Sequence, residues 1–431
     1  MAGREVYTFG PFSLDAVERR LTRDGHLCPL SPKAHDLLVT LVRDAGRLVR
    51  KEDLLDRVWP GAFVEEGILN VHVSTLRKAL GDDSRRPWCI ETVSRAGYRF
   101  IAPVSNLRSG HQSSAAPEDS ELVGRGRFHL LSASRQEVPK AVASYRAVVR
   151  RDPTYAAAHA GLALACCAQA EFRLVPPAEA YGEARAASLR ALAMDSTNAD
   201  AQVALGVVLF LSEWNWTAAE RSFRRALELN PNHTEAYLLY GRLLEARGRL
   251  QEGFEMKLKA LERDPFSPAV HLQISLSYWN QRRFDDSIEW ANRTLALDPE
   301  HLLAREHLAG AYWAKGDFDR HMAENIRHAE AYGVPAAALE PLKQAYAAGG
   351  RQAVVTYALR EASRGPQVAP SIQLALLHGE AGELDAAFEH LDRAIDNHDA
   401  ALVHMAVAPQ WDCLRQDPRF AERLERMGLT G

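Results

Sequence analysis

The sequence lacks the cysteine pattern of a disulfide-linked or zinc-binding protein. Its 431 residues include five cysteines, an odd number, and no Cys-x-x-Cys pair occurs among them. Even numbers of cysteines are typical of disulfide frameworks, and paired spacings are typical of structural zinc sites. We therefore expect reduced thiols, no bound metal and no cofactor, as is usual for a protein of the cytoplasm.

The common signatures of catalysis are also missing. The sequence contains no Gly-x4-Gly-Lys-Ser/Thr loop, no His-Glu-x-x-His and no Gly-x-Ser-x-Gly, the patterns that would indicate phosphate binding, metalloprotease or hydrolase chemistry. The 16 histidines are scattered along the chain. We therefore expect a protein that is not an enzyme.

Long apolar segments and a strong excess of one charge are absent as well. The stretch 153–170 has no charged residue, but it is rich in alanine and too weakly apolar for a membrane span. No apolar stretch follows the N-terminal Met-Ala-Gly-Arg-Glu, so we expect no signal peptide. The net charge is −4, yet residues 1–104 carry 16 Lys and Arg against 14 Asp and Glu. That asymmetry permits a nucleic-acid-binding head on an acidic body.

The residues that are present divide the chain into three regions. Residues 1–104 mix short strand patterns with three helical patterns, and 105–121 are rich in Ser, Gly and Pro without apolar periodicity. Such a composition predicts a flexible linker. The rest is helical in pattern and rich in Ala, Leu and Arg. We expect tetratricopeptide repeats over 122–330, and degenerate helical repeats with C-terminal capping helices over 331–431.

A period of about 34 residues supports the repeats. Breaks begin at Asp195, Asn230, Asp264 and Asp298, at spacings of 35, 34 and 34 residues, and proline follows the last three. A 34-residue unit closed by proline is typical of tetratricopeptide repeats. Each two-helix unit has an apolar face that only stacked neighbours can bury. The sequence therefore predicts an all-α solenoid, most clearly over 139–300.

The first region reads as an α+β domain. Short strand patterns fill the first 30 residues, and Ser31 caps a helix whose first turn contains Pro32. A second helix follows at 51–59 and a third at about 66–80. A final hairpin covers about 90–101. Dense turns between short strands are typical of a small antiparallel sheet.

This order resembles the winged helix-turn-helix domain of the OmpR/PhoB type, over about residues 4–104. The motifs that carry the resemblance are Leu30-Ser31-Pro32-Lys33, Val71-His72-Val73 with Leu76-Arg77-Lys78-Ala79-Leu80, and Gly97-Tyr98-Arg99-Phe100. A winged helix followed by tetratricopeptide repeats further resembles the CadC-like and HilA-like one-component regulators.

The resemblance implies a bacterial transcriptional regulator that binds double-stranded DNA. The helix at 66–80 would enter the major groove, and the wing at 90–101 would reach the minor groove. The chain departs from the response regulators because no receiver domain precedes the winged helix, and from CadC because no membrane span is evident. We therefore expect a cytoplasmic protein that needs neither phosphorylation nor a membrane.

Helical periodicity selects the candidate contacts. With 100° per residue, one side of the third helix is polar apart from Val71. We expect Asn70 to bridge an adenine edge and Val71 to contact a thymine methyl. Arg77 and Lys78 suit phosphates, and Arg95 suits a narrow minor groove. The candidate DNA-binding residues are Asn70, Val71, Ser74, Thr75, Arg77, Lys78 and, at the wing, Arg95. Tyr98 and Phe100 are expected to pack the hairpin onto the helix.

The repeats are the candidate site for signal input or partner recruitment. Inner helices are expected at 155–170, 200–211, 235–247 and 269–281. They carry three polar residues that packing does not require: Arg242, Gln273 and Asn280. The expected partner is RNA polymerase or a regulatory protein, and a dimer on DNA remains open.

Two alternatives remain. The chain could be a protein-interaction scaffold in which the winged helix binds protein, or an antibiotic-regulator-type activator. The basic, polar outer face of the third helix favours DNA binding. The linker and the regular period argue against the antibiotic-regulator type.

Overall fold

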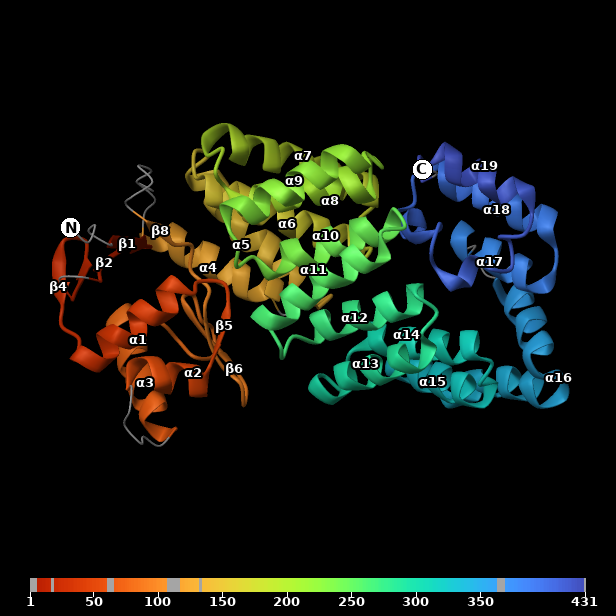
Figure 1. Ribbon diagram of the computed structural model, residues 1–431, viewed down its shortest axis with the longest axis horizontal. Helices are drawn as coiled ribbons and strands as arrows, with labels where there is room; N and C mark the ends of the chain where they lie inside the picture. Colours follow the sequence, from red (N-terminus) through yellow and green to blue (C-terminus); the bar gives the residue numbers. More distant parts are fainter. Residues whose placement is uncertain are drawn as a thin grey trace. The chain divides into compact units, whose positions relative to one another are not determined.

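The computed structural model describes residues 6–16, 19–59, 66–106, 117–131, 134–362 and 369–429. The chain divides into two compact units, Met1–Val208 with Arg221–Ala236 and Leu209–Glu220 with Tyr237–Gly431. Two small sheets with three helices come first, and successive helices follow them (Figure 1). The predicted fold class, a winged helix followed by tetratricopeptide repeats, is confirmed.

The winged-helix part contains two antiparallel sheets. One has the strand order β4-β3-β2-β1-β8, and the other has the order β5-β7-β6. The side chain of Ser31 accepts a hydrogen bond from the amide of Ala34 at 3.3 Å, which confirms the predicted cap of the first helix. The elements are β1 (Val6–Phe9), β2 (Phe12–Asp15), β3 (Arg20–Arg23), β4 (His26–Cys28), α1 (Pro32–Arg43), β5 (Leu48–Arg50), α2 (Lys51–Val58), α3 (Gly67–Leu80), β6 (Ile90–Val93), β7 (Gly97–Phe100) and β8 (Ser105–Asn106).

One apolar core joins these elements. Phe9 of β1 and Phe100 of β7 meet edge to face, with ring centroids 5.0 Å apart. Leu37 and Leu38 of α1 and Leu76 of α3 are fully buried in the same cluster. Apolar burial on this scale fixes the position of α3 against the sheet.

The segment that was expected to be a flexible linker, 105–121, is structured at both ends. Its first two residues form β8, which pairs with β1, and α4 (Pro117–Leu131) begins before the linker was expected to end. Residues 107–116 lie outside the described part of the chain. In α4, a Cβ on Gly124 would overlap the carbonyl oxygen of Trp88. The helix therefore packs directly on the turn that precedes β6.

Helix pairs continue after α4. The elements of this stretch are α5 (Val138–Arg151), α6 (Ala156–Glu171), α7 (Pro177–Met194), α8 (Ala199–Leu211) and α9 (Trp216–Leu229). Small residues let neighbouring helices approach: Ala158, Ala163, Ala165, Ala184 and Ala191 have no exposed surface. The alanine-rich stretch 153–170 is thus mostly a buried repeat helix, as predicted.

The remaining helices belong to the second unit, apart from the first residues of α10. They are α10 (Thr234–Ala246), α11 (Leu250–Arg263), α12 (Pro268–Asn280), α13 (Phe284–Leu297), α14 (Leu302–Lys315), α15 (Phe318–Ala331), α16 (Ala336–Ala362), α17 (Ser371–Ala381), α18 (Leu384–Asp396) and α19 (Pro418–Arg426). The backbone of α16 is non-helical at Gly349 and Gly350. Among the described residues, no helix is both long and apolar enough to cross a membrane.

The end of the chain folds back onto an early segment of the same unit. Trp216 donates its indole N–H to the carbonyl oxygen of Met427 at 2.8 Å. The ring of Trp214 stacks on that of His398, with ring centroids 4.4 Å apart. Arg282 pairs with Asp412 at 2.7 Å. These contacts join residues more than a hundred positions apart in the sequence.

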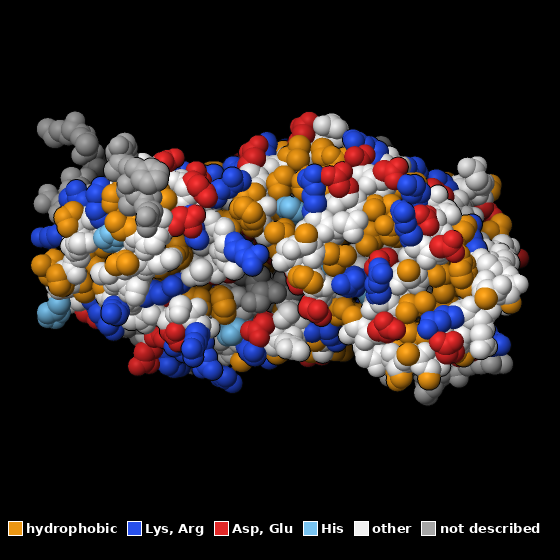
Figure 2. Space-filling view, turned by 90° about the horizontal axis from the view of Figure 1, so that it is seen from below, with side chains coloured by type: hydrophobic (Ala, Val, Ile, Leu, Met, Phe, Trp, Pro, Cys, Tyr) orange, Lys and Arg blue, Asp and Glu red, His pale blue; other side chains and the backbone are white. Residues whose placement is uncertain are grey.

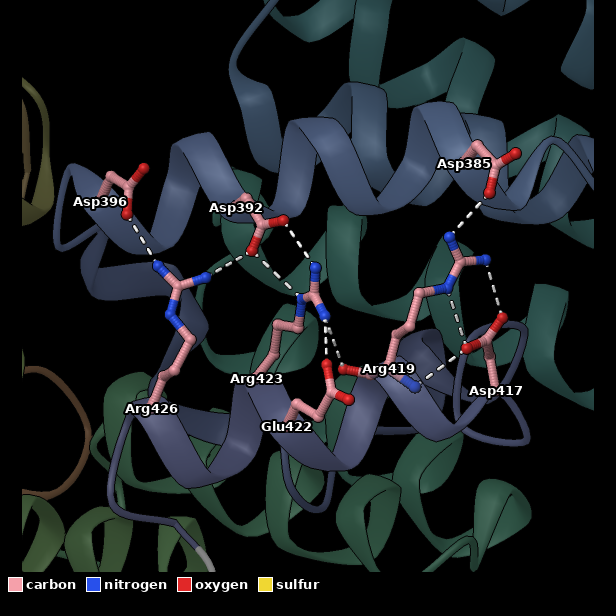
Figure 3. A network of polar contacts seen from close by, with 8 residues as sticks. All are labelled: Asp385, Asp392, Asp396, Asp417, Arg419, Glu422, Arg423 and Arg426. Carbon is pink, nitrogen blue, oxygen red and sulfur yellow. Dashed lines mark hydrogen bonds and ion pairs between the residues drawn. The ribbon is translucent and has the colours of Figure 1, made fainter.

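The C-terminal helix is held mainly by ion pairs. Arg419, Arg423 and Arg426 of α19 point toward the acidic side of α18 (Figure 3). Only Phe420 of α19 is buried, so apolar packing contributes little. The pairs are Arg419–Asp385 at 2.7 Å, Arg423–Asp392 at 2.7 Å, Arg426–Asp392 at 2.5 Å and Arg426–Asp396 at 2.8 Å. A helix near the C-terminus is observed where capping helices were predicted, but these arginine–aspartate pairs were not predicted from the sequence.

Candidate nucleic-acid interface

Helix α3 presents one face to the core and the opposite face to solvent. Leu69, Val73, Leu76 and Leu80 are buried and anchor the helix. The outward residues are therefore not needed for packing. Val71 is 62% exposed although it is apolar, which no contact within the fold explains. Of the candidate DNA-binding residues on this helix, Asn70, Val71, Ser74, Thr75 and Lys78 are exposed.

The exposed side chains differ in what they can still offer a ligand. Thr75 donates its hydroxyl to the carbonyl oxygen of Val71 at 2.9 Å, so only its oxygen lone pairs remain. Within the described part of the chain, Ser74 has no hydrogen bond from its hydroxyl and Lys78 has no ion pair. Ser74 and Lys78 are therefore the groups most available to bases and phosphates.

Arg77 is not placed to bind a phosphate, contrary to the prediction from the sequence. Its guanidinium donates to the carbonyl oxygen of Ile90 and to the hydroxyl of Thr92, both at 2.8 Å, and lies 3.7 Å from the carboxylate of Asp82. The side chain is only 14% exposed. Arg77 thus ties α3 to β6 and is not free to meet a phosphate, unlike its neighbour Lys78.

The turn between α3 and β6 is built around a buried carboxylate. The side chain of Asp82 has no exposed surface and accepts from the backbone amides of Trp88 at 2.7 Å and Ile90 at 3.1 Å. Burial raises the pKa of Asp82, although these amide groups act in the opposite direction. Arg85 and Arg86 are exposed on the same turn. Neither arginine is among the residues predicted from the sequence, although two adjacent cations directly after the third helix are a local signal for them.

The wing is the β6–β7 hairpin. At its tip Arg95 is exposed with a φ of 59°, a left-handed conformation that costs a non-glycine residue about 1 kcal/mol. Gly97 begins β7, where a Cβ would overlap the carbonyl oxygen of Val49 on β5. The glycine therefore lets β7 pair with β5, next to the exposed Arg95 at the hairpin tip.

A hydrogen bond joins the wing to α3. The hydroxyl of Tyr98 on β7 donates to Oδ1 of Asn70 on α3 at 2.7 Å. Burial raises the pKa of Tyr98, which keeps its proton on the oxygen. The expected packing of Tyr98 is thus observed, and one of the two lone pairs of Asn70 Oδ1 is engaged with the wing.

His72 lies beside Trp59 with ring centroids 5.3 Å apart, at the edge of the core. In the described part of the chain, no cluster of three or more His, Cys, Asp or Glu side chains could hold a metal ion. The five cysteines are unpaired. The ring of His72 is thus part of the packing around the end of α2.

The three candidate partner-binding residues lie on α10 and α12, but they are not equivalent. Asn280 is only 4% exposed and donates to Oε2 of Glu245 at 3.0 Å. Glu245 is itself fully buried and also binds Lys257 at 3.0 Å. Asn280 is therefore required for packing, contrary to expectation. Arg242 and Gln273 are partly exposed and remain candidates.

The aromatic residues of these helices serve packing. Arg263 lies over the ring of Tyr237 at 4.4 Å, and Tyr240 donates its hydroxyl to Glu220 at 3.0 Å. Both tyrosines are buried. On the face shown in Figure 2, Lys and Arg side chains are interspersed with Asp and Glu.

Comparison with known proteins identifies both parts of the chain. Residues 25–100 match the family of the transcriptional regulatory protein C-terminal domain, and 215–268 and 272–324 match tetratricopeptide repeats. The transcriptional activator CadC of Escherichia coli is 34% identical over 100 residues, 23% of this chain and 20% of CadC. The phosphate regulon protein PhoB of Pseudomonas aeruginosa is 37% identical over 92 residues, 21% of this chain and 39% of PhoB.

Among solved structures, the DNA-binding domain of Escherichia coli CadC matches with 30% identity and a TM-score of 0.22, covering 24% of this chain and 98% of that domain. The chain thus spans well under half the length of the curated relatives described above. The predicted resemblance is confirmed at the level of domains: the N-terminal part is an OmpR/PhoB-type DNA-binding domain, and tetratricopeptide repeats follow it. Neither family is a family of enzymes.

Proposed function

We propose that this chain is a sequence-specific regulator of transcription that places α3 in the major groove of duplex DNA and the β6–β7 wing in the adjacent minor groove. The observation that carries the proposal is the outward face of α3, where an exposed valine lies among polar groups and an unpaired lysine. An α-helix fits the major groove and can read base edges there.

Each outward residue has a role that its chemistry allows. Val71 contacts a thymine methyl, and the free hydroxyl of Ser74 hydrogen-bonds to a base or a phosphate. Thr75 offers only its oxygen, so it accepts from a base amino group. Lys78 binds a phosphate, and Arg95 enters the minor groove.

The first test measures DNA binding by the full chain at several salt concentrations. Lys78→Ala should lower the slope of log affinity against log salt by about 0.9, because one fewer counterion is released. Lys259→Ala is the matched control, since Lys259 is exposed on α11 outside the winged helix. Absence of DNA binding even at low salt would refute the proposal.

Arg95 permits a test that separates binding from folding. Arg95→Gly removes the charge and also relieves the left-handed strain at φ 59°. We expect the domain to be as stable or more stable, while affinity for A·T-rich flanking sequence falls. Unchanged DNA affinity in Arg95→Gly would show that Arg95 has no contact with DNA. A loss of stability would contradict the expected relief of strain.

We further propose that the repeats bind a protein partner, RNA polymerase or a regulatory protein, and that this binding controls transcription. Tetratricopeptide repeats commonly present extended binding surfaces, which supports the proposal. Arg242 and Gln273 are the residues to test together, while Asn280 is left intact because it is buried. The double alanine variant should lose regulation in a reporter strain and keep its DNA affinity.

A further inference from the structure

The hydrogen bond between Tyr98 and Asn70 links the two elements that would touch DNA. Tyr98 lies on the wing strand β7 and is 4% exposed, whereas Asn70 is exposed on the first turn of α3. The oxygens are 2.7 Å apart. A carboxamide oxygen can only accept, so the tyrosine hydroxyl is the donor.

This bond decides which atoms Asn70 can present to a base. An asparagine that bridges adenine uses its oxygen to accept from N6 and its amide nitrogen to donate to N7. In this fold Oδ1 already accepts from Tyr98. The amide nitrogen has no partner among the described residues. Oδ1 keeps a second lone pair, but the bond to Tyr98 holds this oxygen toward the wing. Asn70 therefore presents its two N–H donors to a base.

We infer that Tyr98 is a positioning residue for base recognition, and that it orients Asn70 to read a guanine. Guanine presents two neighbouring acceptors, N7 and O6, in the major groove, whereas adenine presents one acceptor and one donor. Two outward N–H groups match guanine. The inference rests on the proposed function, because it assumes that α3 lies in the major groove.

The experiment compares variants of the full chain on duplexes that differ at one base pair. The preferred sequence is first selected from a random duplex pool, and Asn70→Ala then identifies the position that Asn70 reads. The wild type should prefer guanine over adenine there by roughly 5- to 150-fold, the range for one good contact. Replacing that guanine with 7-deazaguanine, which lacks the N7 acceptor, should remove part of the preference.

Tyr98→Phe tests the positioning role, since it deletes only the hydroxyl and keeps the buried ring. The freed amide can turn over, so the preference for guanine over adenine should shrink about tenfold while the salt dependence stays unchanged. In the Asn70→Ala background, Tyr98→Phe should change nothing further at this position. Tyr240→Phe is the matched control, because it removes a hydroxyl that donates to Glu220 at a similar distance of 3.0 Å.

The outcomes separate the two proposals. A chain that binds no DNA refutes the proposed function. A chain that binds with normal salt dependence but prefers adenine at the Asn70 position, or shows no Asn70-dependent position, overturns this inference alone. The inference is also overturned if Tyr98→Phe retains the wild-type base preference when binding is measured well below the melting temperature of the variant. A mere loss of stability would lower total active protein without changing the ratio between two bases.

Discussion

Two adjacent cations at the end of α3 should behave in opposite ways when each is replaced by alanine. Arg77 is 14% exposed and makes two hydrogen bonds of 2.8 Å to β6, whereas Lys78 is exposed and has no ion pair in the described part of the chain. Both residues are cations at the end of the same helix, so the difference in their expected behaviour comes from their burial.

The magnitude for Arg77→Ala can be worked from these contacts. A hydrogen bond from a charged group contributes about 1.5 kcal/mol net, so two contribute about 3 kcal/mol. For a domain of about 100 residues, that loss lowers the melting temperature by roughly 12–24 °C. Arg77→Lys should recover little of it, because an ammonium cannot donate in the forked geometry of a guanidinium.

The assay is calorimetry of the full chain together with hydrogen exchange of the α3 and β6 amides. Arg77→Ala should lower the transition of the winged helix and speed exchange in both elements. Lys78→Ala should change stability by less than about 0.5 kcal/mol, as is usual for an exposed residue, and reduce only the salt dependence of DNA binding. If Arg77→Ala melts like the wild type and lowers the salt slope by about one, Arg77 is a phosphate ligand and this reasoning fails.

Three further predictions concern packing, ion pairs and pH. Gly124→Val should displace α4 from the carbonyl oxygen of Trp88 and so speed hydrogen exchange in α4. Gly124→Ala should speed the exchange less. Unchanged exchange in both variants would contradict the contact. Arg423→Ala should weaken the attachment of α19 by about 1–2 kcal/mol, because it removes a partly buried ion pair with Asp392 and a cation–π contact 5.2 Å from the ring of Phe388. Limited proteolysis should then cut the C-terminus sooner. High salt should have the same effect on the wild type, because it screens the ion pair. Burial lowers the pKa of His307 to about 4, so the folded repeats hold it neutral while the unfolded chain protonates near pH 6.5. Its contribution to the free energy of unfolding, up to about 3 kcal/mol, is complete above pH 6.5 and is lost as the pH falls toward 4. Between pH 7 and pH 5, the free energy of unfolding in urea should therefore change less in His307→Asn than in the wild type. An equal change in both proteins would contradict the prediction.

Local patterns were enough to predict most of the elements. The cap at Ser31, the third helix at about 66–80 and the 34-residue spacing of the breaks each depend on residues close together in the sequence. Hydrophobic periodicity then assigned the buried side of α3, and with it the exposed side that carries the candidate contacts. The resemblance to the OmpR/PhoB type depended on motifs of the same short range.

Pairings between distant residues were not predictable in this way. Strands β5 and β8 are three and two residues long, too short for an alternating pattern to identify, and each exists because a distant strand supplies hydrogen-bond partners. The linker was expected to be flexible for its composition, yet α4 packs on Trp88. The closure of Trp216 onto Met427 joins residues 211 positions apart.

By itself the sequence determined the kind of protein: a winged helix whose third helix carries cations, followed by stacked helix pairs. Only the tertiary structure decided which polar side chains remain available. Arg77, Asn70 and Asn280 look alike in the sequence as exposed polar groups, but each is committed to a partner on another element: Thr92, Tyr98 and Glu245. The physical reason is that a polar group that is buried or nearly so, such as Arg77, Asn280 or the hydroxyl of Tyr98, must be paired to offset its desolvation. Helical periodicity gives the side on which a residue lies, but the identity of its partner depends on where the rest of the chain is placed.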